Sequence, residues 1–416
     1  MTHPSRQPTL ERTIWAAAFA IVLFALTWTV LHQGFYKHRQ ILDTPVYQHY
    51  GNLIADGKVP YRDFDLEYPP GALPMFALPG LARHGHDQDV TPGFRRTFET
   101  LMWLCGAGAL LALSFGLRAL GRGTAGMSAA LAFAALAPLA LGSVVLSRFD
   151  LWPAAVVAAA LASLLSGRLR LGHALLGLGV VIKLVPAVLV PLGVTFAWKR
   201  RGRQEAFLCL GIAVGVVAVL FLPFVVLAPG GVWHSVTFQL RRPLQVESLG
   251  SAFLLVAHHV FGVGVTGETS HGSQNLAGAG ADTLAALSTV AQLAVLVWIW
   301  TAFARGPGDR ERLARSSAAA LCAFIAFGKV LSPQFLIWLI PVVPLVRGRR
   351  GIGACLLLVL ALVLTQLWFP FRYFRLALGF EQGLSWLLLS RDLVLVALTV
   401  LLVTPLRRGA SRQGSP

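Results

Sequence analysis

Long apolar runs alternate along the chain with short polar segments that are rich in arginine and lysine. The runs cover residues 13–33, 98–117, 124–146, 151–166, 172–198, 204–228, 283–304, 316–346, 351–370 and 384–405. A helix needs about 20 apolar residues to cross a bilayer, so each run predicts at least one membrane helix. The pattern therefore predicts an all-α polytopic membrane protein with a single transmembrane domain over residues 1–416.

The basic loops constrain how these runs cross the membrane. If the N-terminus is inside and every run crosses once, the arginine-rich loops 199–203 and 305–315 both fall outside. Short basic loops belong on the cytoplasmic side, so this simple topology contradicts the positive-inside rule. At least two runs must therefore depart from a straight single crossing.

Two runs are interrupted near their middle, one by Lys183 and Pro186 and the other by Lys329 and Pro333. A lysine at mid-bilayer is costly, and a proline removes a helical hydrogen bond. If each run is a pair of short helices meeting at the outer face, both lysines reach that face and both basic loops return to the cytoplasm. We therefore expect about eight full spans and two broken helical hairpins, with both termini cytoplasmic. A lysine that snorkels from a straight span is the alternative.

This topology leaves three long segments outside, 34–97, 229–282 and 371–383. Short outer turns at 147–150, 183–186 and 329–334 join them. Within the first outer loop, Gly71–Leu81 is apolar but too short to cross, so we expect an interfacial helix there. The Gly/Ser-rich stretch Gly264–Gly280 in the second is expected to be a flexible loop. The first helix, Ile14–Leu31, lacks a cleavage site at signal-peptide distance and is expected to be retained.

The composition agrees with a membrane protein and excludes several other classes. Only 13% of the residues are charged, against about 25% in soluble proteins. The net charge of +17 comes mostly from clusters between apolar runs, where it sets topology and meets anionic lipid. We therefore expect membrane lipids as partners and no nucleic acid. Phosphate-loop and dinucleotide-binding motifs are absent from the polar segments, which argues against a nucleotide donor or ATP.

No metal or other cofactor is expected. The four cysteines all lie inside apolar runs, where they form neither a disulfide framework nor a zinc site. Asp63, Asp65 and Glu67 alternate beside prolines, which is more typical of a solvated loop than of a cation site. His84 and His86 are two residues apart, which does not suit a pair of ligands on one helix.

An ordered set of motifs runs from about residue 43 to 340. The motifs are Asp43-x-x-Val-Tyr47, Gly57-x-x-Pro-Tyr61-Arg-Asp-Phe, Glu67-Tyr-Pro-Pro-Gly71, Ser147-Arg-Phe-Asp150, Gly177-x-Gly-x-x-x-Lys183-x-x-Pro186, Arg242-Pro-Leu-Gln-Val-Glu247-Ser248 and Lys329-Val-Leu-Ser-Pro-Gln334. With this set the chain resembles polytopic glycosyltransferases of the glycosyltransferase-C superfamily. The group most similar in pattern is the actinobacterial polyprenol-phosphate-mannose-dependent mannosyltransferases, glycosyltransferase family 87.

The resemblance implies a glycosyltransferase-C-like helical bundle in a bacterial plasma membrane, with its active site on the non-cytoplasmic face. It also implies a polyprenyl-phosphate sugar donor, with mannose as the sugar, and inverting transfer to a lipid or glycan acceptor. The family's catalytic acid in the first outer loop maps onto Asp43. A histidine that assists in some relatives has no match here, so no histidine enters the catalytic set.

The chemistry of such a transfer suggests roles for the outer polar residues. A lipid phosphate leaving group needs positive charge, and an acceptor hydroxyl needs one carboxylate as general base. We take Asp43 as that base, and Asp150 as the partner of Arg148. The expected substrate-binding residues are Tyr47, Tyr61, Asp63, Glu67, Arg148, Asp150, Lys183, Arg241, Arg242, Glu247, Lys329 and Gln334.

Each residue also has a structural alternative. Asp43 would be a helix cap or an ordinary loop acid, and Arg148 with Asp150 a purely structural ion pair. Arg241 and Arg242 would contact lipid headgroups, and the two lysines would be membrane anchors.

Two other functions compete with the glycosyltransferase. Broken helices with buried charge are also a feature of transporters, so a transporter or flippase of a lipid-linked or anionic substrate is one. A transporter predicts internal repeats and a site at mid-membrane, whereas here the charges gather at one face and no repeat is found. The other is a non-catalytic scaffold or a different lipid-linked transferase, in which Asp43→Asn does no more harm than an ordinary loop substitution.

Overall fold

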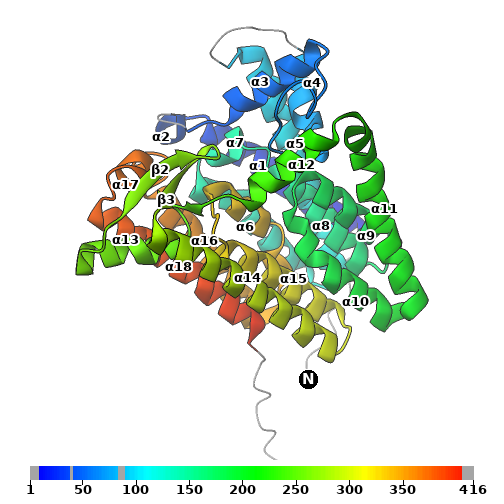
Figure 1. Ribbon diagram of the computed structural model, residues 1–416. Coiled ribbons are helices and arrows are strands. Elements are labelled where there is room, and N and C mark those ends of the chain that lie inside the picture. The colour runs from blue at the N-terminus through cyan, green and yellow to red at the C-terminus, as the bar shows by residue number, and fades with distance from the viewer. Residues whose placement is uncertain (1–8, 38–40, 83–89, 405–416) are drawn as a thin grey trace, which may run out of the picture.

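A bundle of long helices dominates the computed structural model, which describes residues 9–37, 41–82 and 90–404 (Figure 1). Seven helices are long and apolar enough to cross a membrane. They are α1 (Leu10–Leu31), α5 (Pro92–Ala119), α6 (Thr124–Leu141), α11 (Arg203–Leu227), α14 (Ala279–Arg305), α16 (Gly348–Gln366) and α18 (Gln382–Val403). Only 6% of the most apolar window of α11, and 11% of that of α14, is buried by protein. Apolar faces of this size need lipid around them, so the chain is a multi-pass membrane protein.

The eighth expected span forms a shorter helix. It is α8 (Leu151–Leu165), which has 15 residues and packs between α5 and α9. At about 1.5 Å per residue its length is roughly 22 Å, less than the apolar thickness of a bilayer. Most of its residues are buried by protein, so α8 lies within the bundle and exposes little surface to lipid.

The first interrupted run breaks where the sequence predicts. Helix α9 (Leu169–Ile182) ends at Lys183, whose backbone is extended at φ −158° and ψ 135°. The 3-10 helix η2 (Val185–Leu189), which contains Pro186, and helix α10 (Val190–Arg201) follow. The interruption confirms the expected break and takes the Lys183 side chain out of a continuous helix.

The second run is broken more completely. Helix α15 (Arg310–Phe327) ends before Gly328, and the chain then passes through two 3-10 helices, η3 (Pro333–Leu339) and η4 (Val343–Leu345). Nearly every residue of these two segments is buried. Protein therefore shelters this irregular backbone, as it must at membrane depth.

Hydrogen bonds bring the basic loops together at one end of the bundle. The Lys199 ammonium donates to the Gly306 carbonyl at 2.8 Å. Arg310 donates to the Ala119 carbonyl and Arg347 to the Leu120 carbonyl, each at 3.1 Å. The loops after α5, α10, α14 and η4 therefore share one side, which is what the hairpin topology requires.

Both the start of α1 and the end of α18 also belong to this basic end. His32, just after α1, pairs with Glu99 near the start of α5 at 3.0 Å, so α1 and α5 run in opposite directions. Helix α18 points downward in Figure 1 toward the end of α14 and the start of α15. The opposite end carries the irregular segments and the short helices.

The short elements at this opposite end come from four parts of the chain. The first part holds α2 (Gly34–Lys37), α3 (Thr44–Ala55), η1 (Pro70–Ala72) and α4 (Pro74–Ala82). The others are α7 (Val144–Ser147) before α8, α12 (Pro229–Leu240) with α13 (Leu249–Phe261), and α17 (Tyr373–Ala377). Helix α4 corresponds to the interfacial helix expected at Gly71–Leu81, and it packs on α3 and α5.

A small antiparallel sheet replaces the flexible loop expected at Gly264–Gly280. Strand β3 (Ser273–Ala277) lies between β1 (Leu244–Gln245) and β2 (Thr266–Ser270). The β2–β3 turn consists of His271 and Gly272, both with positive φ (53° and 64°), as a two-residue hairpin turn requires. The expectation of a flexible loop was wrong because composition alone does not report pairing with β1.

Helices α3 and α4 cross in close contact at two glycines, Gly51 and Gly80. A Cβ atom added to Gly80 would collide with the Gly51 backbone. We expect Gly80→Ala to push α3 away from α4 and to destabilise the protein by about 1–3 kcal/mol. Thermal unfolding in detergent measures this, with Gly108→Ala as the control because Gly108 has open space around it. Equal melting temperatures for the two variants would contradict the close crossing.

Candidate active site

A cluster of charged side chains lies at the end of the bundle opposite the basic loops. It draws on five parts of the chain: the start of α3, the loop before η1, the α7–α8 junction, the break after α9, and the segment from α12 to α13. Its central members are Asp43, Glu67, Arg148, Asp150, Lys183, Arg242 and Glu247.

Asp43 occupies the N-cap position of α3, yet its side chain makes no capping hydrogen bond. The carboxylate instead forms an ion pair with the Arg148 guanidinium through Oδ2. The Tyr47 hydroxyl, one helical turn later, donates to the same oxygen at 3.4 Å. The Asp43 side chain is 28% exposed and that of Arg148 is 7% exposed. The buried Arg148 guanidinium therefore fixes the Asp43 carboxylate and leaves it accessible. The Asp43 side chain is not the cap of α3.

Aromatic side chains pack around the start of α3, next to the Asp43–Arg148 ion pair. The Tyr47 ring stacks on Phe76 of α4 with the centroids 4.7 Å apart, and it meets Phe149 edge to face at 5.7 Å. Tyr68 also contacts both Phe76 and Phe149 edge-on or tilted. These rings fix the start of α3 against the α7–α8 junction, and so fix Asp43 relative to Arg148.

Asp150 binds Lys183, and not Arg148 as we expected. The Lys183 ammonium donates to Asp150 Oδ1 at 2.6 Å, and the Trp338 indole donates to the same oxygen at 2.8 Å. The backbone explains the difference. Arg148 is extended whereas Asp150 begins α8, so their side chains leave the turn toward different partners.

Lys183 sits in a cage of aromatic rings. Its ammonium lies 4.9 Å from the Phe149 centroid, 5.3 Å from that of Phe335 and 5.0 Å from that of Trp338. Phe335 and Trp338 come from η3, so the two broken runs meet at this lysine. Ring faces attract a cation without supplying a proton acceptor. The Lys183 charge is therefore held in place by Asp150 and the rings, with its side chain still 16% exposed.

Glu67 is partly buried and lies within electrostatic reach of Arg242 and Lys183. Burial raises the pKa of the Glu67 carboxyl, while these two cations and a hydrogen bond from Tyr68 oppose the shift. The Arg242 guanidinium donates to Ser273 Oγ at 3.1 Å and to the His271 carbonyl at 3.4 Å. The β2–β3 turn therefore holds Arg242 at the edge of the cluster.

Glu247 is as deeply buried as Asp150, each with 1% exposure. Its carboxylate accepts a hydrogen bond from the Gln245 side chain. Burial raises the pKa of Glu247 to about 7, although Arg391, Arg148, Gln245 and Arg242 all oppose the shift. Gln245 and Arg391 were not predicted from the sequence. A charged pair, Arg391-Asp392, inside the apolar run 384–405 was the signal that could have revealed one of them.

Lys329 and Arg241 take peripheral positions. The Lys329 ammonium donates to the Leu240 carbonyl at the end of α12 (2.9 Å), and the Lys329 carbonyl accepts from the Gln245 backbone N–H (3.0 Å). Lys329 therefore joins the second broken run to the α12–β1 segment. Arg241 is exposed and ends α12.

Three other predicted residues lie outside the charged cluster. Asp63 is held within its own loop by Arg62 at 2.9 Å and by the Val59 backbone N–H at 2.7 Å, and these bonds lower its pKa to about 2. The Tyr61 hydroxyl donates to the Tyr68 carbonyl at 2.6 Å, and its ring packs on Phe224. Gln334 is half-buried at the start of η3.

Metal ligands do not gather anywhere in the part of the chain that the structure describes, where no group of three His, Cys, Asp or Glu side chains is found. His84 and His86 lie outside the described residues. Asp63 and Glu67 of the first outer loop also do not share one site, because Asp63 pairs with Arg62 whereas Glu67 interacts with Arg242.

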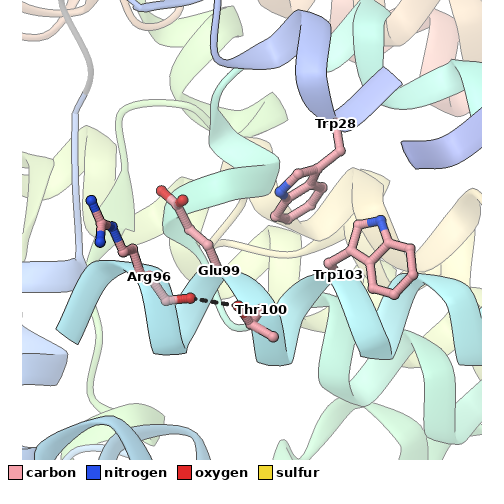
Figure 2. A pocket seen from close by; sticks show the side chains of 5 residues that line it. All are labelled: Trp28, Arg96, Glu99, Thr100 and Trp103. Atoms are coloured by element: carbon pink, nitrogen blue, oxygen red, sulfur yellow. Dashed lines mark hydrogen bonds between the residues drawn. The ribbon is translucent and has the colours of Figure 1, made fainter. Parts of the chain in front are cut away.

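A hollow of about 370 Å³ lies elsewhere, between α1 and α5. Figure 2 shows Trp28 reaching down from α1 toward Trp103, with Arg96, Glu99 and Thr100 along the same helix, α5. None of the charged cluster's residues lines it. Two tryptophans beside charged groups are typical of the membrane–water interface, so the hollow marks that boundary.

The sequence profile of glycosyltransferase family 87 matches residues 66–333 of the chain. The chain belongs to this family. The matched range contains Glu67, Arg148, Asp150, Lys183 and Glu247, whereas Asp43 lies before it. Membership of family 87 makes the protein a multi-pass membrane glycosyltransferase and favours an enzyme over the transporter and the scaffold.

Two solved structures align with most of the family-87 chain. ArnT from Cupriavidus metallidurans bound to undecaprenyl phosphate shares 15% identity, with 93% of this chain and 77% of ArnT covered and a TM-score of 0.48. An oligosaccharyltransferase from Archaeoglobus fulgidus, in complex with zinc and sulfate, shares 13% identity over 94% of this chain and 48% of its own, with a TM-score of 0.37. No curated protein matches the sequence.

Proposed function

We propose that this family-87 glycosyltransferase moves mannose from a polyprenyl-phosphate donor to a hydroxyl of a lipid or glycan acceptor, with inversion and with Asp43 as general base. The observation that carries the proposal is the state of Asp43. Asp43 is the N-cap residue of α3, but its carboxylate makes no capping bond and pairs with Arg148 instead. A second ion pair, Asp150–Lys183, belongs to the same cluster.

The polyprenyl phosphate suits the cations of this cluster. When the bond between the sugar C1 and the phosphate oxygen breaks, both electrons leave with the phosphate, so no proton donor is needed. Lys183 and Arg242 supply charge-assisted hydrogen bonds to such an anion, and Arg148 holds the base. The lipid chain of the donor would remain in the bilayer beside the bundle.

The acceptor hydroxyl loses its proton as its oxygen bonds to C1. A carboxylate on the face opposite the leaving phosphate takes this proton and inverts the configuration at C1. Asp43 is accessible enough for this role, and Tyr47 and Arg148 fix its orientation. Glu67 and Glu247 would accept hydrogen bonds from sugar hydroxyls.

The proposed orientation places the cluster on the outer face of a bacterial plasma membrane, with both termini in the cytoplasm. The support is the charge distribution. The arginine-rich loops 118–122, 199–203, 305–315 and 347–350 lie at the end opposite the cluster, and positive loops remain in the cytoplasm.

The function is tested by reconstituting the purified protein in liposomes with radiolabelled polyprenyl phosphate mannose and a crude lipid and glycan fraction as acceptor. We expect label to move from the donor to a lipid or glycan. Transfer only from a polyprenyl phosphate carrying another sugar would overturn the choice of mannose. No transfer from any lipid-phosphate sugar would overturn the donor class.

Asp63→Asn is expected to leave activity within about twofold of wild type, because Asp63 is engaged inside its loop and lies outside the cluster. The same transfer assay measures this. A large loss in a well-folded Asp63→Asn protein would return Asp63 to the substrate-binding set.

A further inference from the structure

Two adjacent charged residues, Arg391 and Asp392, are completely buried in the spanning helix α18. Their side chains pair, with Arg391 Nε 2.7 Å from Asp392 Oδ1. Ionisable residues inside membrane helices are costly and usually serve a function. Asp392 neutralises the Arg391 charge, which accounts for the aspartate. The presence of the arginine itself needs another reason.

The Arg391 guanidinium also reaches out of its own helix. Its Nη2 donates to the Glu247 backbone carbonyl at 2.7 Å, and the group lies 5.6 Å from the Trp368 ring centroid. The bonded carbonyl belongs to the tight connection between β1 and α13. In the same connection Ser248 caps α13, and Ser251 Oγ donates to the Gln245 carbonyl at 2.7 Å. Arg391 therefore ties a spanning helix to the turn that carries Gln245 and Glu247.

The turn is linked to Asp43, the proposed base, by Arg148, which interacts electrostatically with Glu247 and pairs with Asp43. Charged and titratable groups from four elements surround the Glu247 carboxylate: Arg391 of α18, Arg148 before α8, Arg242 after α12 and Tyr373 of α17. Gln245 of β1 donates to it directly. Arg148 is in turn the ion-pair partner of Asp43. A continuous path of contacts and charges thus runs from Arg391 through Glu247 and Arg148 to Asp43.

We propose that Arg391 is a positioning residue, which fixes the Glu247 turn so that the Glu247 carboxylate holds Arg148 in place against Asp43. The inference rests on the proposed function insofar as Asp43 is the base. Arg391 does not touch the substrate, and its effect reaches the reaction through the orientation of Arg148.

Two variants separate positioning from simple charge balance. Arg391→Lys keeps the pair with Asp392 but loses the Nη2 hydrogen bond to the Glu247 carbonyl. The double variant Arg391→Met/Asp392→Leu removes both charges together, so neither is left buried and unpaired. Asp392→Asn is the matched control, because it changes the pair but keeps the Arg391 bond to the turn.

In the transfer assay we expect Arg391→Lys to lower kcat about tenfold with little change in donor KM, since a hydrogen bond from a charged donor is lost. The double variant should lose at least as much. It should also shift the acidic limb of the pH–kcat profile to higher pH. Burial raises the pKa of Glu247 to about 7, and the Arg391 charge opposes that shift, so removing this charge raises the pKa further and favours the protonated form. The limb should stay in place in Arg391→Lys, which keeps the charge.

A second readout does not depend on the donor. Amide hydrogen exchange should become faster in residues 244–250 in both variants and remain unchanged in α9 and α11. Unchanged exchange in 244–250 or wild-type kcat in correctly folded Arg391→Lys overturns the positioning role. An acidic limb that does not move in the correctly folded double variant does the same. If wild type transfers no sugar from any lipid phosphate while the exchange result holds, the proposed function fails and the tie between α18 and the Glu247 turn stands.

Discussion

Asp43→Asn is expected to lower kcat about 1,000-fold, with donor KM nearly unchanged. An amide of the same size retains hydrogen bonding to Arg148 and Tyr47 but cannot take a proton, and general-base catalysis contributes roughly 100- to 10,000-fold. The loss should appear in kcat because the substituted group acts in the transition state and not in donor binding. The measurement is transfer of labelled sugar by reconstituted protein under single-turnover and steady-state conditions.

The matched control is Asp63→Asn, which makes the same chemical change in the same outer loop at a residue that binds only Arg62 and a backbone N–H. A thermal melt checks that removing the Asp43 charge, which leaves the buried Arg148 without its ion-pair partner, has not unfolded the protein. Full activity in folded Asp43→Asn would transfer the base role to Glu67 or Glu247, the cluster carboxylates outside the Asp43–Arg148 and Asp150–Lys183 ion pairs.

The topology followed from the sequence because charge and apolar length act over whole segments. Two basic loops on the wrong side required two departures from straight spans, and Lys183-x-x-Pro186 marked the first of them. The structure breaks α9 at Lys183 and brings loops 199–203 and 305–310 together. These features depend on solvation and on the missing N–H of proline, which are local properties of the sequence.

Pairing between side chains was less predictable. Asp150 and Arg148 are close in sequence and looked like partners, yet each binds a residue from a distant element. Lys329 resembled Lys183 in its sequence context but donates to a backbone carbonyl at the end of α12. Which partner an ion selects depends on the packing of helices that are more than 30 positions apart in the chain, and a single sequence does not reveal that packing.

The buried charged pair in the middle of α18 shows a further limit of prediction from sequence. The apolar run 384–405 was interpreted as a plain span, so its internal Arg391-Asp392 pair carried no assignment. Only the fold reveals that this arginine donates to the Glu247 carbonyl. The sheet that positions Gln245 was also hidden, because β1 has only two residues and β2 (Thr-Gly-Glu-Thr-Ser) contains no apolar side chain to alternate with its polar ones.

Removing Lys183 should weaken donor binding strongly, and we expect Lys183→Met to lower kcat/KM for the donor about 100-fold. The lysine provides a fixed positive charge at the point where the two broken runs meet, and charge-assisted bonds to phosphate are worth about 1.5–3 kcal/mol each. The effect should fall mainly on KM, because the charge binds the phosphate before and after transfer. Protection of the protein against thermal unfolding by polyprenyl phosphate measures the same interaction without catalysis.

The single substitution also leaves Asp150 buried with only Trp338 as a donor, which by itself costs about 3–5 kcal/mol. The double variant Lys183→Met/Asp150→Asn removes this penalty, so it should melt close to wild type and still gain no protection from polyprenyl phosphate. Lys329→Met is the matched control, since it deletes the lysine of the other broken run and should keep most of the protection. If the double variant is protected as strongly as wild type, the phosphate binds elsewhere, and Arg242 at the edge of the cluster becomes the cation to test.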